Sequence, residues 1–134
     1  MSELPDSKNY FSPRWSPTGQ YIAAVTKDST KIVLFDTKSR TWSDLTQPTM
    51  GVIGYPSWSH DGQYIYFDTS FNEDPGFFRI RVADRKLEKL CSLKDVRRLS
   101  SNFGSWAGLA PDDSPLLIRD ISSQEIYALD WQEP

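Results

Sequence analysis

The chain has 134 residues, which is the size of one domain on the usual prior of roughly 100–200 residues per domain. Charged residues make up 25% and hydrophobic residues 38%, a balance that excludes disordered and fibrous proteins. The net charge of −3 argues against a nucleic-acid-binding protein. No apolar run approaches the roughly 18–20 residues of a membrane-spanning helix, so no membrane insertion is expected. With one cysteine and one histidine, the chain forms no internal disulfide and lacks most common catalytic constellations.

The N-terminal sequence bears on the cellular compartment. Residues 1–6 contain neither a basic stretch nor an apolar core, so we expect no secretory signal in this chain. The expected compartment is the cytoplasm for the chain as it stands. It would be the periplasm if the chain belonged to a longer, exported protein.

An internal repeat is the strongest signal in the sequence. The segment WSPTGQYI, residues 15–22, recurs as WSHDGQYI, residues 58–65, at a shift of 43 residues. A degenerate third copy, LAPDDSPL, residues 109–116, aligns with the first at a shift of 94. At that same shift KIVLFD, residues 31–36, falls without a gap on EIYALD, residues 125–130. Because the copies agree at two separate places, we interpret the chain as three structural units.

The predicted elements are short strands separated by turns. In chain order the strands are expected at residues 20–26, 31–36, 41–46, 63–69, 78–84, 87–93 and 125–130. These segments are rich in β-branched and aromatic residues or alternate between polar and apolar ones. Gly19 and Gly62 fit tight hairpin turns, where glycine supplies a positive φ. No stretch has a convincing helical period, so the predicted fold class is all-β.

Units of roughly 40–45 residues with four strands are typical of β-propeller blades. The pattern Trp-Ser-x-x-Gly-x-Tyr-Ile resembles the TolB-like (WD-related) propeller repeat, whose hallmark is a Trp-Ser-Pro-Asp-Gly turn between the innermost and second strands. The resemblance covers nearly the whole chain, and the tail also resembles the C-terminal three blades of bacterial regulator propellers. It implies a partial β-propeller of three four-stranded blades, the last one incomplete. Their approximate bounds are residues 11–54, 55–98 and 99–134, after an N-terminal extension at 1–10.

Residues at equivalent repeat positions are the first candidates for a role. Identity at such positions is expected where blades pack together, which gives a structural role to Trp15, Gly19, Tyr21, Trp58, Gly62 and Tyr64. Arg14 and Ser57 share the preceding position on the innermost strand. Because neighbouring residues of a strand point to opposite faces, they are weak candidates for lining a channel that binds a ligand or peptide.

The number of blades predicts self-assembly. Propellers close with four to eight blades, so three blades leave two apolar faces without a neighbour. Two copies would give six blades, the number that the TolB resemblance implies; three copies would give nine, and we favour the dimer. A mildly basic first unit and an acidic third unit fit head-to-tail contact, but they equally fit ordinary solvated faces. Trp131 and Tyr127 are candidate interface residues, because aromatic side chains are enriched at interfaces.

Residues that carry chemistry in other proteins have simpler interpretations here. His60 is expected as an exposed turn residue, and Cys91 as a packed or edge residue of an outer strand. No spacing of cysteine and histidine suits zinc, and the acidic turns at 72–74 and 111–113 lack the pattern of a calcium loop. The sequence therefore predicts no catalytic residue, no metal and no cofactor.

These observations predict a non-catalytic binding or scaffold module, a half-propeller that assembles with itself and has a protein or peptide as a further possible partner. One alternative is the C-terminal sensor or protein-interaction fragment of a larger regulator. Another is a propeller enzyme with a site at the channel mouth. The basic run from Arg79 to Arg98 lacks the aromatic platform of a single-strand binder, so no nucleic-acid partner is expected.

Overall fold

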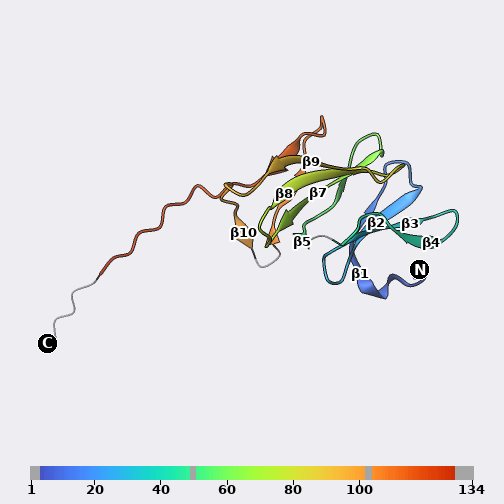
Figure 1. Cartoon of the computed structure of the whole chain (residues 1–134), viewed down its shortest axis with the longest axis horizontal. Helices are drawn as coiled ribbons and strands as arrows, with labels where there is room; N and C mark the ends of the chain where they lie inside the picture. The colour runs from blue at the N-terminus through green and yellow to red at the C-terminus, as the bar shows by residue number, and fades with distance from the viewer. Residues whose placement is uncertain (1–3, 49–50, 102–103, 129–134) are drawn as a thin grey trace.

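The computed structural model describes residues 4–48, 51–101 and 104–128. The described chain is all-β, with several antiparallel sheets and a single short 3-10 helix, η1 (Ser7–Asn9), before the first strand. The sheets follow one another along the chain, and the first two lie side by side (Figure 1). This arrangement is that of a partial β-propeller.

The first sheet is a four-stranded meander. Its strands pair in sequence order: β1 (Tyr10–Trp15), β2 (Tyr21–Thr26), β3 (Ile32–Asp36) and β4 (Thr41–Asp44). Directly opposite residues share a face, so pairing across the four strands defines one row of side chains, called here the Trp15 row. It consists of Trp15, Ile22, Phe35 and Trp42. The opposite face carries a second row, Arg14, Ala23, Leu34 and Ser43.

The second sheet repeats this plan with an interrupted inner strand. Its strands are β5 (Val52–Ile53), β6 (Ser57–Trp58), β7 (Tyr64–Ser70), β8 (Gly76–Arg81) and β9 (Leu87–Ser92). Both β5 and β6 pair with β7. The inner strand β1 of the first sheet has a matching irregularity between Phe11 and Arg14, where Ser12 has a φ of 53°. The predicted strands of these two units agree with the observed ones to within a few residues.

The main core lies between the first two sheets. Its buried members are Ala23, Val25, Ile32, Leu34, Leu45, Ile53, Ile65, Phe67 and Ile80. They come from the Arg14 side of the first sheet and from the Trp58 side of the second. The rings of Phe67 and Phe78 stack with their centroids 5.6 Å apart. Burial of this apolar area from both sheets is the principal force that joins the two units.

The third unit is smaller. Two hairpins form it: β10 (Ser100–Ser101) with β11 (Gly104–Ser105), and β12 (Ala107–Leu109) with β13 (Pro115–Leu117). A second cluster of buried residues, Tyr66, Phe77, Leu93 and Ala107, packs it against the second sheet. In this unit Leu109 pairs with Pro115, whereas Trp15 pairs with Ile22. The third turn is thus one residue shorter than the first. The alignment of the first and third repeat copies at a shift of 94 residues therefore does not hold after this turn.

The predicted strand over residues 125–130 is wrong for the part that the structure describes. Residues 121–128 have no strand pairing and run away from the sheets (Figure 1, red). Ile126 and Tyr127 are 101% and 79% exposed. A strand is stabilised by a partner ladder and by burial of one face, and the described residues after β13 form no further sheet that would provide that burial. Residues 129 and 130 lie outside the described residues.

Candidate interaction site

The two Trp-Ser turns share a hydrogen bond from the backbone to the serine hydroxyl. The buried hydroxyl of Ser16 accepts the backbone N–H of Tyr21 at 3.0 Å, and that of Ser59 accepts the N–H of Tyr64 at 2.9 Å. Gly19 and Gly62 have φ values of +71° and +70°. Only a residue tolerant of positive φ closes this turn without strain, which explains the glycine in both copies. Tyr21 and Tyr64 are half-buried beside the turns.

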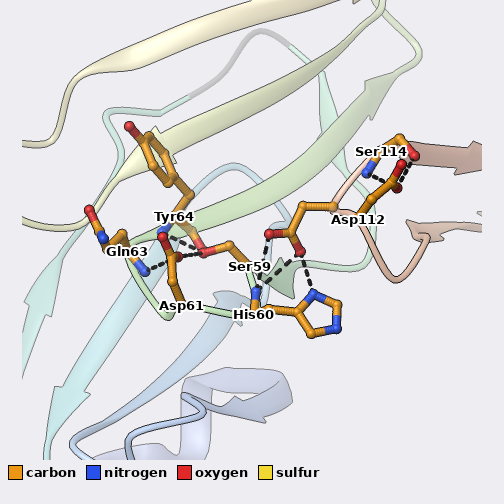
Figure 2. Close-up of polar contacts among 8 residues, drawn as sticks. Ser59, His60, Asp61, Gln63, Tyr64, Asp112 and Ser114 are labelled. Carbon is orange, nitrogen blue, oxygen red and sulfur yellow. Dashed lines mark hydrogen bonds and ion pairs between the residues drawn. The ribbon is translucent and has the colours of Figure 1, made fainter.

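The third turn keeps this backbone with different residues. Asp113 takes the glycine position at a φ of 62°, and Ala110 stands where the others have serine. The Asp113 carboxylate accepts the backbone N–H of His60 at 3.1 Å and lies 2.7 Å from the Nδ1 atom of the same residue. Figure 2 shows the second and third turns meeting through these contacts. His60 thus connects two units and has no nucleophile among its described partners.

Two carboxylates of these turns have lowered pKa values for structural reasons. The Ser59 hydroxyl, followed by the backbone N–H of Gln63, donates to Asp61 and lowers its pKa. Ser114 lowers the pKa of Asp112 in the same way, through its hydroxyl and its backbone N–H (Figure 2). Both carboxylates stay ionised and hold their turns, which leaves them poorly suited to act as general bases.

The repeated tryptophans lie in different surroundings. Trp58 is half-buried against the main core, and its indole Nε1 donates to the backbone oxygen of Arg14 at 2.9 Å. Trp15, at the equivalent position, is 63% exposed, and its indole N–H has no hydrogen-bond partner in the part of the chain that the structure describes. Within the described residues, the expected packing of Trp15 between blades is therefore not met.

The candidate channel residues occupy equivalent register positions but form no site by themselves. Arg14 is exposed on β1 and its Nη1 donates to the neighbouring Pro13 oxygen at 3.1 Å. Ser57 is half-buried on β6 and pairs with Tyr66. The strands β1 and β6 contact each other. Gly108 holds the corresponding position of the third unit, opposite Leu116.

Of the two interface candidates, the structure describes one. Tyr127 is exposed in the C-terminal segment, and its hydroxyl donates to the nearby Glu125 carboxylate. Trp131 lies outside the described residues.

A buried ion pair was missed by sequence reasoning. The Arg98 Nη1 atom lies 2.7 Å from the Asp68 Oδ2 atom, and the two side chains are only 9% and 2% exposed. Arg98 also donates to the backbone oxygens of Ser105 and Trp106, at 3.3 and 3.4 Å. The pair fastens the third unit to β7. In the sequence, Arg98 ends a basic run and Asp68 lies in a predicted strand, and neither pattern indicates that the two side chains pair.

A groove of about 900 Å³ lies between the end of β4 and the strands β8 and β9. Its apolar floor includes Leu45, Phe67, Phe78 and Ile80, and its rim carries Glu73, Asp74 and Arg85. Volumes of this order are typical of ligand sites. No sequence motif marks the groove, because its lining comes from segments far apart in the chain.

Two features that would indicate a function are absent from the described residues. Across residues 4–48, 51–101 and 104–128 there is no group of three or more metal-ligating side chains. The same ranges contain no helix long and apolar enough to cross a membrane.

Comparisons with known proteins point to one class. No family model matches the sequence. No curated protein matches it at a significant level. Among solved structures, TolB from Acinetobacter baumannii matches 78% of this chain at 25% identity and a TM-score of 0.59. A protein assigned as TolB from Agrobacterium tumefaciens matches 83% at 24% identity and a TM-score of 0.53, which shows the fold alone.

The fold thus places the chain in the class of β-propeller segments. Within that class its relationship is to TolB-like propellers, as the Trp-Ser turns predict. The chain matches only 25% and 36% of the lengths of the two TolB structures.

Proposed function

We propose that the chain is a non-catalytic binding or scaffold module that forms half of a propeller. Its three blades, residues 11–54, 55–98 and 99–134, would close a six-bladed ring with a second copy. The observation that carries this proposal is the contrast between Trp58, which joins the first two sheets through the Arg14 oxygen, and the exposed Trp15.

The repeat supports a specific partner for Trp15 in this proposal. Gly108 corresponds to Arg14, so in a head-to-tail dimer the Trp15 indole N–H of one copy would donate to the Gly108 oxygen of the other. Leu116 lies opposite Gly108 on the same face, and Ile118 follows in the same alternation. These two side chains are 43% and 42% exposed, which gives the indole an apolar surface to cover.

The charges support a head-to-tail arrangement. The first unit has more basic than acidic residues, whereas the third unit is acidic, with Asp112, Asp113, Asp120, Glu125, Asp130 and Glu133 against Arg119 from residue 112 onward. A heterologous contact between unlike surfaces forms a ring when its rotation closes.

Substitution of Trp15 tests this function. Trp15→Ala is expected to weaken the dimer at least about tenfold, as measured by sedimentation velocity over a range of concentrations, because buried tryptophans are frequent hot spots. Phe71→Ala is the matched control: it removes an aromatic side chain that is 83% exposed on a distant loop. The proposal fails if both variants dimerise like the unsubstituted chain.

A second candidate rests on the partial coverage of the TolB structures. If the chain is the C-terminal fragment of a larger regulator, a preceding blade of the same polypeptide covers Trp15. The isolated chain would then remain monomeric, and a separately produced segment bearing the preceding blades would bind it through Trp15.

A further inference from the structure

The groove between the end of β4 and the strands β8 and β9 has an apolar strip that follows β8. Phe78 and Ile80 alternate on one face of β8, opposite Phe67 and Ile65 of β7. Leu87, opposite Ile80 on β9, extends the strip and is 50% exposed. All the lining comes from the first two units, so the groove is complete within one chain and does not depend on ring closure.

An exposed aromatic side chain lies at the edge of this groove. Phe71, in the loop between β7 and β8, belongs to the lining and is 83% exposed. Its φ of 58° lies in the left-handed region, which bulky residues rarely adopt. The ring buries little in the folded chain, whereas aromatic side chains are enriched as anchors of binding interfaces. Phe71 is thus available to contact an occupant of the groove.

Two unpaired charges of opposite sign lie at the two ends of β8. Glu73 precedes this strand and Arg85 follows it, and neither side chain has an ion pair among the described residues. The other acidic side chains of the lining are each paired with a lysine, Asp44 with Lys31 and Asp74 with Lys89. With six residues, β8 is roughly 20 Å long. The groove therefore has a free anion and a free cation about one strand length apart, with the apolar strip between them.

The Arg85 end also offers hydroxyl groups. A smaller pocket of about 250 Å³ adjoins the groove at Leu45 and Arg85, which line both. Its hydroxyl-bearing lining residues are Tyr21, Ser39, Thr41 and Ser43. Asp36 lines it too, but its carboxylate already accepts the backbone N–H groups of Lys38 and Ser39. Hydroxyls beside a guanidinium can donate to a carboxylate, so an acidic group is favoured at this end.

We propose that the groove binds an extended peptide segment of a partner protein. Its basic side chain lies at Glu73, its apolar side chains lie on the strip, and its acidic side chain lies at Arg85. Alternate side chains of an extended chain share one face at a spacing of roughly 7 Å, which is also the spacing of Phe78 and Ile80 along β8. A segment of seven residues with charged ends spans roughly the 20 Å of β8. This site is additional to the proposed ring.

The probe for the test is a capped, fluorescein-labelled peptide, Lys-Thr-Leu-Thr-Leu-Thr-Glu, whose charged and leucine side chains share one face when it is extended. Fluorescence anisotropy should show saturable binding to the full chain, and a peptide with serine for both leucines should bind at least about tenfold more weakly. Phe71→Ala should weaken binding at least about fivefold. Trp15→Ala, whose side chain lies outside the groove, is the control and should bind the probe like the unsubstituted chain.

A charge exchange tests the direction of the peptide in the groove. Arg85→Glu makes both ends of the groove acidic and should weaken binding of the probe at least about threefold. This variant should prefer a peptide with lysine at both ends, whereas the unsubstituted chain should prefer the probe. Arg85 and Phe71 are both exposed, so these variants are expected to fold.

The outcomes are independent of ring closure, which the mass in solution measures. No saturable binding of the probe to the unsubstituted chain up to about 1 mM overturns the proposal. Equal binding of the serine peptide also overturns it, because the apolar strip would then have no part in recognition. The same order of preference for the two charged peptides in the unsubstituted chain and in Arg85→Glu would show that Arg85 does not bind the acidic end, and this too overturns the proposal.

Discussion

The contact between the first and second sheets differs in kind from the contact between the second sheet and the third unit. The first is a continuous apolar core to which both complete sheets contribute. The second has a smaller apolar cluster and depends more on polar contacts, the Asp68–Arg98 ion pair and the His60–Asp113 pair. Two full sheets bury each other's faces, whereas a unit with two inner strands has too little apolar area to do so. The difference shows that a blade of this kind is completed by its neighbours.

The largest expected effect is the loss of unfolding free energy when a buried side chain is truncated, which should be greater between the first two sheets than at the third unit. Phe67 is 1% exposed in the main core. Phe67→Ala should lower the free energy of unfolding by about 3–5 kcal/mol, because the substitution leaves a cavity in a packed core. Leu117 is half-buried in the smaller cluster, and Leu117→Ala should lower the free energy of unfolding by less than about 2 kcal/mol. Urea unfolding measures both. Equal losses would contradict the stated difference between the contacts.

Removal of one partner of the buried ion pair should have the next largest effect. Arg98→Met leaves the Asp68 carboxylate buried without its counter-charge, which costs about 3 kcal/mol. The double variant Asp68→Asn with Arg98→Met should regain much of that loss, because no unpaired charge remains. The free energies of unfolding of the two variants test this. A double variant as unstable as Arg98→Met would contradict this, because the two side chains would then stabilise the fold by packing and not by their charges.

The serine turns allow the repeat itself to be tested. Ser16→Ala and Ser59→Ala each leave a backbone N–H, that of Tyr21 or Tyr64, without its acceptor and should cost about 1–2 kcal/mol. The reverse change in the third turn, Ala110→Ser, should alter the unfolding free energy by less than about 0.5 kcal/mol. Thermal denaturation compares the three variants. Ser59→Ala should cost at least as much as Ser16→Ala, because the Ser59 hydroxyl also donates to the Asp61 carboxylate. A smaller loss for Ser59→Ala would contradict the shared role of the two serines.

The smallest effect concerns pH. Because hydrogen bonds lower the pKa of Asp61 in the folded state, its charge stabilises the fold above the unfolded pKa of about 3.8. That contribution is lost as the pH falls through the lower, folded value. The melting temperature of Asp61→Asn should lie slightly below that of the unsubstituted chain at about pH 6, and the two should converge once the pH has fallen below the lowered, folded pKa. A difference between the two melting temperatures that stays the same as the pH falls would contradict this account of Asp61.

The sequence predicted the fold well where local patterns determine it. The Trp-Ser-x-x-Gly turns fix the hairpins, and runs rich in apolar, β-branched and aromatic residues fix β2, β3, β7 and β8. The same pattern failed at residues 125–128, because a strand sequence forms a strand only beside a partner and under a covering face. Local pattern carries no information on whether that covering face exists.

Contacts between segments that lie far apart in the chain could not be predicted from the sequence. The Asp68–Arg98 pair and the contact of Pro5 with Trp42 each join residues about 30 or more positions apart, without any motif at either end. Trp15 illustrates the same limit. Its repeat position predicts a side chain that packs between units, whereas the structure shows Trp15 to be 63% exposed.

The central claim is that two half-propellers close one ring, and the absolute mass of the chain in solution tests it most directly. Light scattering behind a sizing column, at several loading concentrations, should give twice the mass of one chain at the higher concentrations. A folded species with the mass of one chain at every concentration would contradict the claim. The exposed Trp15 would then be a surface for a different partner.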